Sequence, residues 1–347
     1  MSAESEKKAR AVKTVKAAEA VKAAKTVKAA INITPELEKK KGFVLSIERF
    51  SIHDGPGVRT SIFLKGCPLS CIWCHNPESH RMKPELKYVG ESCVECGACG
   101  QVCSNNVHSF SDFHNSKGTE HQIQWAECEL CQECIHICPT GALSVSGKVM
   151  NVEEVMQQVR KDRAYYRSDG GITLSGGEPL LQPEFSRQLL QRCKEEGITT
   201  CVETCGDVNQ NAFCRIEKYT DLFLFDFKLS DPENMKEYTG GNLNRILENL
   251  KYLCQNGKEV ILRCPIIPGI NDKEEHFQKI ASLAADLPLS DVELMPYHSF
   301  GKGKWSQVGK AYLLNDLETV GKDQTRLWKE HLDYLIIQKR SSTGMLT

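Results

Sequence analysis

Short apolar runs and amphipathic helical stretches alternate along the chain from residue 43 onward. The apolar runs predict strands over residues 43–50, 60–65, 171–174, 198–202, 222–225, 260–263 and 292–295. The clearest helix covers residues 183–196, because Pro183 stands at its start, Gly197 follows it and its apolar residues share one face. Repeated strand–helix units call for a parallel sheet with right-handed crossovers. The six units from Thr60 onward therefore predict an α/β fold, a partial (β/α)6 TIM-like barrel.

Two segments depart from this alternation. Residues 84–148 interrupt it just after the first barrel strand, which indicates an inserted domain. Residues 1–41 are rich in Ala, Val, Lys and Glu, and the string TVKAA occurs twice. This composition predicts a tail that is disordered rather than a docking arm. We therefore expect a tail (1–41), a barrel (42–83 and 149–347) and an insertion (84–148).

Composition narrows the class of protein. A length of 347 residues suits one barrel of about 250 residues with additions. The chain is 40% hydrophobic and 26% charged, its mean hydropathy is -0.38, and no apolar run reaches the ~18 residues of a membrane span. A net charge of -1 gives no overall field for nucleic acid. With no apolar leader at the N-terminus, we expect a cytoplasmic protein.

The cysteines carry the chemistry. There are 17, and eleven of them lie between Cys67 and Cys138 at short spacings. A disulfide scaffold would be short and secreted. Dense thiolates in a cytosolic chain indicate metal ligands, because a cation must neutralise them. The other six are expected to be small buried hydrophobes: Cys193, Cys201, Cys205, Cys214, Cys254 and Cys264.

Two of the cysteine groups have the spacing CxxCxxCxxxC, which is that of a bacterial two-cluster ferredoxin. In that pattern three ligands of each run hold one [4Fe-4S] cube and the fourth holds the other. One cluster is therefore assigned to Cys93, Cys96, Cys99 and Cys138, and its neighbour to Cys128, Cys131, Cys134 and Cys103. Zinc is the alternative, since CxxC pairs also build zinc ribbons. Two equal runs favour iron–sulfur and a ferredoxin-like insertion.

The remaining group, Cys67, Cys71 and Cys74, reads GCPLSCIWCHNPES. Three cysteines leave one iron of a cube open, which implies a ligand that reacts. The loop resembles the CxxxCxxC loop of radical S-adenosylmethionine (SAM) enzymes, whose unique iron chelates the amino and carboxylate groups of SAM. Three unrelated core cysteines are the alternative.

Polar residues end the predicted strands, where the loops of an α/β barrel converge on one mouth. Gly176 and Gly177, just before Glu178, would let a ligand approach the backbone closely. A tight turn is the alternative. Asp226 and Lys228 share one face of an extended segment, so Lys228 can meet a ligand carboxylate while Asp226 takes a hydroxyl; an ordinary ion pair is the alternative. Further polar strand-end residues are Glu203, Thr204, Arg263 and His298.

Together, these motifs resemble the glycyl radical enzyme activating enzymes. The resemblance rests on residues 53–59 (HDGPGVR), the CxxxCxxC loop, SGGEP, the D-x-K pair, IPGIND at 267–272, and PYH at 296–298 with Gly301. It covers about residues 43–305. The two-cluster insertion is similar to the longer subgroup that activates choline lyase, glycerol or diol dehydratase, hydroxyproline dehydratase, isethionate lyase and arylacetate enzymes.

The resemblance implies a set of site residues. The expected SAM contacts are Trp73, Cys74, His75, Gly177, Glu178, Glu203, Asp226, Phe227, Lys228, Arg263 and His298. Glu203 and Thr204 stand where the family can hold a monovalent cation. Asp54 and Arg59 of the DGPGVR segment are expected to face the glycine loop of a partner.

The implied reaction is one-electron reduction of the cluster at Cys67, Cys71 and Cys74, followed by cleavage of SAM to methionine and a 5′-deoxyadenosyl radical. That radical takes hydrogen from a backbone glycine of a partner glycyl radical enzyme, and no side chain need act as a general acid or base. Flavodoxin or ferredoxin is the expected electron donor, through the inserted clusters. The alternatives are a radical SAM enzyme acting on a small molecule and a simple electron carrier.

Overall fold

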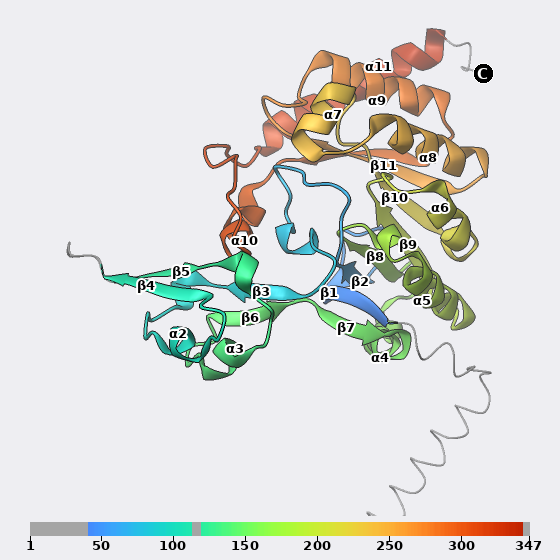
Figure 1. Cartoon of the computed structure of the whole chain (residues 1–347). Helices are drawn as coiled ribbons and strands as arrows, with labels where there is room; N and C mark the ends of the chain where they lie inside the picture. The colour runs from blue at the N-terminus through green and yellow to red at the C-terminus, as the bar shows by residue number, and fades with distance from the viewer. Residues whose placement is uncertain (1–40, 113–118, 343–347) are drawn as a thin grey trace, which may run out of the picture.

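The computed structural model describes residues 41–112 and 119–342, so the predicted tail lies outside the described residues except for Lys41 (Figure 1). Its centre is an eight-stranded sheet with the order β12-β11-β10-β9-β8-β2-β1-β7. The run from β2 to β12 is parallel throughout. These six strands are β2 (Arg59–Leu64), β8 (Gly171–Gly176), β9 (Thr199–Thr204), β10 (Leu222–Asp226), β11 (Glu259–Ile266) and β12 (Asp291–Pro296). The predicted α/β fold with a parallel sheet is therefore confirmed.

Two antiparallel strands extend one edge of the parallel run. β1 (Lys41–Ser51) pairs with β2 and with β7 (Lys148–Asn151). All seven predicted strands are present. β7 was not predicted, because four residues with only two apolar ones, Val149 and Met150, give too weak a pattern. Its first residue, Lys148, pairs with Val44, so the chain has already returned to the main sheet where the insertion was expected to end.

Helices flank the sheet on its outer face (Figure 1). They are α4 (Val152–Asp162), α5 (Pro183–Glu195), α6 (Gln210–Ile216), α7 (Pro232–Thr239), α8 (Leu243–Gln255), α9 (Glu274–Asp286) and α11 (Lys322–Ser342). α5 matches the predicted helix 183–196. Strand alternation divides the core: Phe223 and Phe225 of β10 belong to the large cluster shared with the helices, whereas Leu222 and Leu224 form a separate inner cluster with neighbouring strands.

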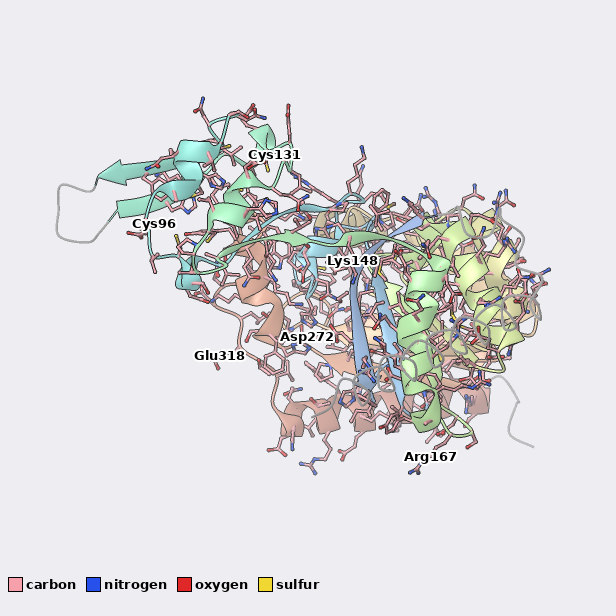
Figure 2. The ribbon with its side chains drawn as sticks, turned by 90° about the horizontal axis from the view of Figure 1, so that it is seen from below. Cys96, Cys131, Lys148, Arg167, Asp272 and Glu318 are labelled. Atoms are coloured by element: carbon pink, nitrogen blue, oxygen red, sulfur yellow. The ribbon has the colours of Figure 1, made fainter. Side chains whose placement is uncertain are left out.

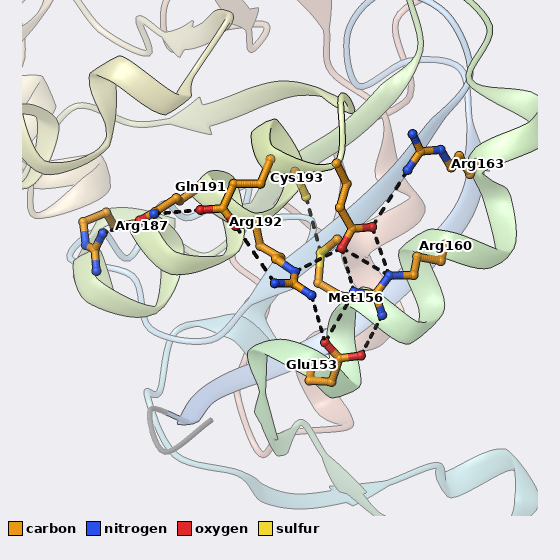
Figure 3. A network of polar contacts seen from close by, with 10 residues as sticks. Glu153, Met156, Arg160, Arg163, Arg187, Gln191, Arg192 and Cys193 are labelled. Carbon is orange, nitrogen blue, oxygen red and sulfur yellow. Dashed lines mark hydrogen bonds and ion pairs between the residues drawn. The ribbon is translucent and has the colours of Figure 1, made fainter. Parts of the chain in front are cut away.

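A network of ion pairs joins α4 to α5 on the surface (Figure 3). Arg160 lies 2.6 Å from Glu153 on its own helix and 2.7 Å from Glu196 just beyond α5. Arg192 of α5 also reaches Glu196, at 3.0 Å. Because Glu196 accepts from two arginines, the network fixes the register between the two helices in addition to the apolar packing beneath it.

The inserted segment packs beside the sheet with a small core of its own, and Cys96 and Cys131 lie within it, away from the main sheet (Figure 2). It contains β3 (Glu85–Tyr88) paired with β6 (Leu143–Ser146), and β4 (His108–Asp112) paired with β5 (Thr119–Ile123). Two one-turn helices, α2 (Ala98–Val102) and α3 (Glu133–Ile137), carry cysteines. A buried ion pair, Lys65 to Glu85 at 3.0 Å, ties the end of β2 to the start of β3. Among the described residues, no helix is both long and apolar enough to span a membrane.

Candidate active site

A cavity of about 310 Å³ opens at the carboxyl ends of the six parallel strands. Twelve of the residues expected to bind a cluster, SAM or a partner line it. They are Asp54, Cys67, Cys71, Trp73, Cys74, His75, Gly177, Glu203, Asp226, Lys228, Arg263 and His298. The structure therefore brings the strand-end residues and the loop cysteines, from segments far apart in the sequence, to one cavity.

The loop after β2 brings Cys67, Cys71 and Cys74 to the same cavity. Burial raises the pKa of Cys71 far above that of an ordinary thiol and raises that of Cys74 to about 12. Thiolates at these positions therefore need a cation beside them, which an iron–sulfur cluster supplies. Three thiols from one loop, in a cavity with room for a further ligand, fit a cluster with one open iron.

Contacts from a distant segment hold this loop in place. Trp305 of α10 (Lys302–Ser306) donates its indole N–H to the carbonyl of Cys74 at 2.9 Å. Gly301 packs so closely that a Cβ there would lie 2.6 Å from the Cα of His75. On the opposite side, a Cβ on Gly177 would lie 2.2 Å from the carbonyl oxygen of Gly66. These glycines allow backbone to approach backbone around the cluster loop.

Asp226 and Lys228 lie side by side at the end of β10. Lys228 Nζ donates to Asp226 Oδ2 at 2.7 Å. Burial opposes the charge on Lys228, but the Asp226 carboxylate together with Cys71 and Cys205 more than offsets it, so the pKa of Lys228 is raised well above its usual value. Asn271, from the IPGIND motif, donates to the carbonyls of Lys228 at 2.8 Å and Pro265 at 2.7 Å. Lys228 is thus a charged hydrogen-bond donor whose backbone is held in place by Asn271.

Glu203 is engaged by an arginine. Arg263 Nη1 donates to Glu203 at 3.0 Å, Arg263 Nε donates to Glu293 at 2.9 Å, and the guanidinium also donates to the backbone carbonyl of His53. Ser175 donates its hydroxyl to Glu203 as well. The carboxylate expected at a cation position is therefore neutralised by Arg263 in this structure.

Two histidine rings stack at the mouth of the cavity. The rings of His75 and His298 lie 3.8 Å apart at 24°, and His75 donates Nε2–H to the backbone carbonyl of His298 at 3.0 Å. Burial, with a smaller effect of His298, lowers the pKa of His75 to about 4. Nδ1 of His298 is buried and has no hydrogen-bond partner in the described chain. Neutral aromatic faces and one open polar atom suit a heteroaromatic ligand.

Three expected contacts are placed elsewhere. Glu178 is fully buried and accepts from Thr204 Oγ1 at 2.9 Å and from the Cys205 amide at 2.8 Å. Phe227 lies between two cavity residues in the extended chain, so its ring points to the opposite face and stacks on His276 at 5.6 Å. The side chains of Glu178 and Phe227 therefore support the site from behind and do not line it.

Arg59 is the third. It is 1% exposed and lies beneath the DGPG turn. It donates to Pro56 O at 3.0 Å, Asp169 O at 3.2 Å and Thr173 Oγ1 at 2.7 Å. Because β2 begins at Arg59, the side chain lies at the end of the strand away from the cavity. Arg59 fastens the turn to the barrel, while Asp54 reaches the cavity and accepts from Ser51 Oγ at 2.5 Å.

Cys205 lines the cavity, although the sequence analysis grouped it with packing cysteines. It lies next to Cys67, and this neighbouring thiol lowers the pKa of Cys67. Its position just after Glu203 and Thr204 was the available signal, because the same strand-end argument applied to it. The other buried cysteine of that strand, Cys201, belongs to the inner cluster with Leu222 and Leu224, as a packing role requires.

The inserted segment contains two further cysteine-lined cavities. One is lined by Cys93, Cys96, Cys99 and Cys138, and the other by Cys103, Cys128, Cys131 and Cys134. These are the two quartets expected from the exchanged fourth ligand. Four thiols around each cavity fit a closed [4Fe-4S] cube, in contrast to the three that the loop after β2 supplies to the barrel cavity.

Comparisons with known proteins agree with this geometry. The radical SAM superfamily model matches residues 128–281, and a 4Fe-4S dicluster domain model matches residues 92–142. The 4-hydroxyphenylacetate decarboxylase activating enzyme of Clostridioides difficile is 38% identical over 85% of this chain and 92% of its own length. The choline trimethylamine-lyase activating enzyme of Oleidesulfovibrio alaskensis is 38% identical over 79% and 89%, and the (2S)-3-sulfopropanediol dehydratase activating enzyme of Klebsiella oxytoca is 37% identical over 85% and 92%. The chain therefore belongs to the glycyl radical enzyme activating enzymes of the radical SAM superfamily.

Proposed function

We propose that this enzyme activates a glycyl radical lyase, dehydratase or decarboxylase, using SAM and the cluster held by Cys67, Cys71 and Cys74. The observation that carries the proposal is that these three thiols share one cavity with the Asp226–Lys228 pair and with Asp54 of the DGPG turn. When bound, the cluster and SAM supply the 5′-deoxyadenosyl radical that removes hydrogen from the partner's glycine. The partner's glycine loop enters at Asp54.

The cavity residues bind and orient SAM. Lys228 is the cation for the SAM carboxylate, because it is charged, only partly exposed at the edge of the cavity and already hydrogen-bonded to one carboxylate at 2.7 Å. The backbone at Gly177, which lines the cavity, receives the methionine amino group. The stacked His75 and His298 take the adenine, with His298 Nδ1 as the open polar atom. Trp73 and the barrel wall exclude water from the reacting carbon.

The inserted quartets bind two further [4Fe-4S] clusters, which gives three in all, and pass electrons from flavodoxin or ferredoxin to the barrel. Their support is the matched pair of four-cysteine cavities. Cys93→Ala and Cys131→Ala remove one ligand from each cluster. Loss of activity with an intact first cluster supports an electron relay, whereas a modest loss favours a docking role for the insertion.

The same proposal includes the domain organisation. Six parallel strands with their helices form a partial (β/α)6 barrel, interrupted by a ferredoxin-like insertion between β2 and β7. Such a barrel leaves its mouth open at one side, where a protein loop can enter beside the DGPG turn.

Two measurements test the function. Reconstituted, reduced enzyme incubated with SAM is expected to yield 5′-deoxyadenosine, which an electron carrier would not do. Addition of purified choline lyase, arylacetate decarboxylase or diol dehydratase partners is expected to produce a glycyl radical signal in electron paramagnetic resonance (EPR) with one of them. SAM cleavage with no radical on any protein partner, and consumption of a small molecule instead, would contradict the proposal.

A further inference from the structure

Two histidines lie hydrogen-bonded between the cysteine quartets of the insertion. His108 of β4 and His121 of β5 come from paired strands, and His108 Nδ1 is 2.9 Å from His121 Nε2. No motif singled them out, and the proposed function assigns them no role.

Each ring faces a different quartet. His121 lines the cavity of Cys93, Cys96, Cys99 and Cys138, with Nδ1 3.7 Å from Cys93 Sγ and Nε2 3.8 Å from Cys99 Sγ. His108 lines the cavity of Cys103, Cys128, Cys131 and Cys134. The pair therefore bridges the two cavities.

The outer nitrogen of His108 has no partner within the described chain. The residue is 6% exposed, and Nε2 is buried without a hydrogen bond. Buried polar atoms nearly always have a partner, and leaving one unpaired costs about 1–3 kcal/mol. Nδ1, on the other side of the ring, is already taken by His121. The missing partner of Nε2 must therefore come from the cavity that His108 lines.

The rings are held in place by aromatic packing. Phe110 stacks on His121 with ring centres 4.5 Å apart at 15°, and Tyr88 meets it edge-on at 4.8 Å. A neutral imidazole has one N–H, so the shared contact decides which end of the pair can donate outward. If His121 donates Nε2–H to His108 Nδ1, then His108 carries its proton on Nε2, where the unpaired atom needs one.

We propose that His108 donates Nε2–H to a sulfur of the cluster held by Cys103, Cys128, Cys131 and Cys134, with His121 as the positioning residue that sets its tautomer. This proposal rests on the cluster assignment in the proposed function. Hydrogen bonds to cluster sulfurs are one of the features that set a cluster's reduction potential. A hydrogen bond donated to the sulfur stabilises the extra negative charge of the reduced cluster. The hydrogen bond therefore makes this cluster easier to reduce than it would be without His108.

The test is an anaerobic redox titration of the full reconstituted chain, followed by EPR. His108→Phe keeps an aromatic ring but removes the N–H donor. We expect the equilibrium constant for reduction of one inserted cluster to fall at least tenfold, which lowers its reduction potential by about 59 mV for one electron. His108→Gln, which retains an N–H donor, is expected to recover part of the shift. Cys131→Ser, which changes a ligand of the same cluster, identifies its signal.

Two further variants keep the test decisive. His121→Phe preserves the stack on Phe110 and should shift the same cluster in the same direction by less. His136→Phe is the matched control, because His136 is exposed on α3 and lines neither cavity. If His108→Phe leaves both potentials unchanged, or moves only the cluster at Cys93, the proposal is wrong.

Metal analysis separates this proposal from a zinc site. Cys99, His108 and His121 place ligand atoms within 4.8 Å of one another, so a single zinc ion there is the competing arrangement. Zinc in the purified protein with loss of one cube would overturn the proposal. The potentials are read without SAM or a partner, so a failure of glycyl radical formation leaves this result unaffected.

Discussion

Lys228 Nζ lies 2.7 Å from Asp226 Oδ2, and both side chains face the cavity that the three loop cysteines line. The two residues share a face because they are two apart in extended chain. In the absence of a ligand, each satisfies the other's charge. A ligand that brings its own carboxylate and hydroxyls therefore finds a paired cation and anion already desolvated and in position.

Lys228→Gln is expected to weaken SAM binding about 10- to 100-fold, because a charge-assisted hydrogen bond contributes roughly 1.5–3 kcal/mol. Isothermal titration calorimetry of the reconstituted enzyme with SAM measures the dissociation constant. Lys194→Gln is the control, since Lys194 forms a similar 2.6 Å pair with Asp221 on the surface, where such pairs contribute little. Equal affinity of Lys228→Gln and wild type would remove Lys228 from the site.

The same alternation explains what the sequence could and could not predict. Buried apolar runs such as Leu222–Asp226 predicted the strands, and the polar residues after them predicted the cavity. The D-x-K motif was treated as three contiguous contacts, but a strand turns every second side chain away, which moved Phe227 to the helix side. The stacking of His75 on His298 joins residues far apart in the chain, and only the fold brings them together.

Arg59 was misplaced for a related reason. The motif HDGPGVR indicated function, and the sequence carried no sign that its arginine would be buried beneath the turn. A guanidinium has five N–H donors in a fixed plane, so Arg59 can bond the carbonyls of Pro56 and Asp169 and the hydroxyl of Thr173 at once. The single ammonium group of a lysine could not. The cysteine quartets were easier to predict from sequence, because the CxxCxxCxxxC spacing with its exchanged fourth ligand indicates which thiols meet around each cavity.

Arg59→Lys is expected to destabilise the protein by at least about 2 kcal/mol, because lysine cannot reach Pro56, Asp169 and Thr173 together. Denaturant unfolding under anaerobic conditions measures the loss. Glycyl radical formation should fall more than SAM cleavage, since the DGPG turn loosens while the cluster loop is untouched. The surface variant Arg187→Lys should change stability by less than about 0.5 kcal/mol. An Arg59→Lys protein as stable as wild type would show that the turn needs no such anchor.

His276 should make stability depend on pH. It is 3% exposed, neither ring nitrogen has a hydrogen-bond partner within the described residues, and burial lowers its pKa to about 4. An unfolded histidine has a pKa of about 6.5, so the unfolded state takes up a proton first as the pH falls. The folded state therefore loses up to about 3 kcal/mol between pH 7 and pH 4.

His276→Leu is expected to remove that part of the pH dependence and to raise stability at pH 7, because two unpaired buried nitrogens are replaced by an apolar side chain. Anaerobic unfolding midpoints at pH 7, 6 and 5 check both effects. His136→Gln, at an exposed histidine of α3, should follow the wild-type curve. A variant that keeps the wild-type slope would assign the pH dependence to other groups.

Removal of the loop thiols should separate the reactive cluster from the other two. Cys67→Ala, Cys71→Ala and Cys74→Ala combined are expected to lower iron from about twelve to about eight per chain and to abolish 5′-deoxyadenosine formation. The matched control replaces three buried cysteines that line none of the three cysteine-lined cavities, Cys193, Cys254 and Cys264. Its iron should stay at about twelve, although the three lost sulfurs will cost packing energy. Iron analysis with the SAM cleavage assay decides the matter: an unchanged iron content in the loop variant, or an equal loss in the control, would mean that the barrel cavity does not hold the cluster.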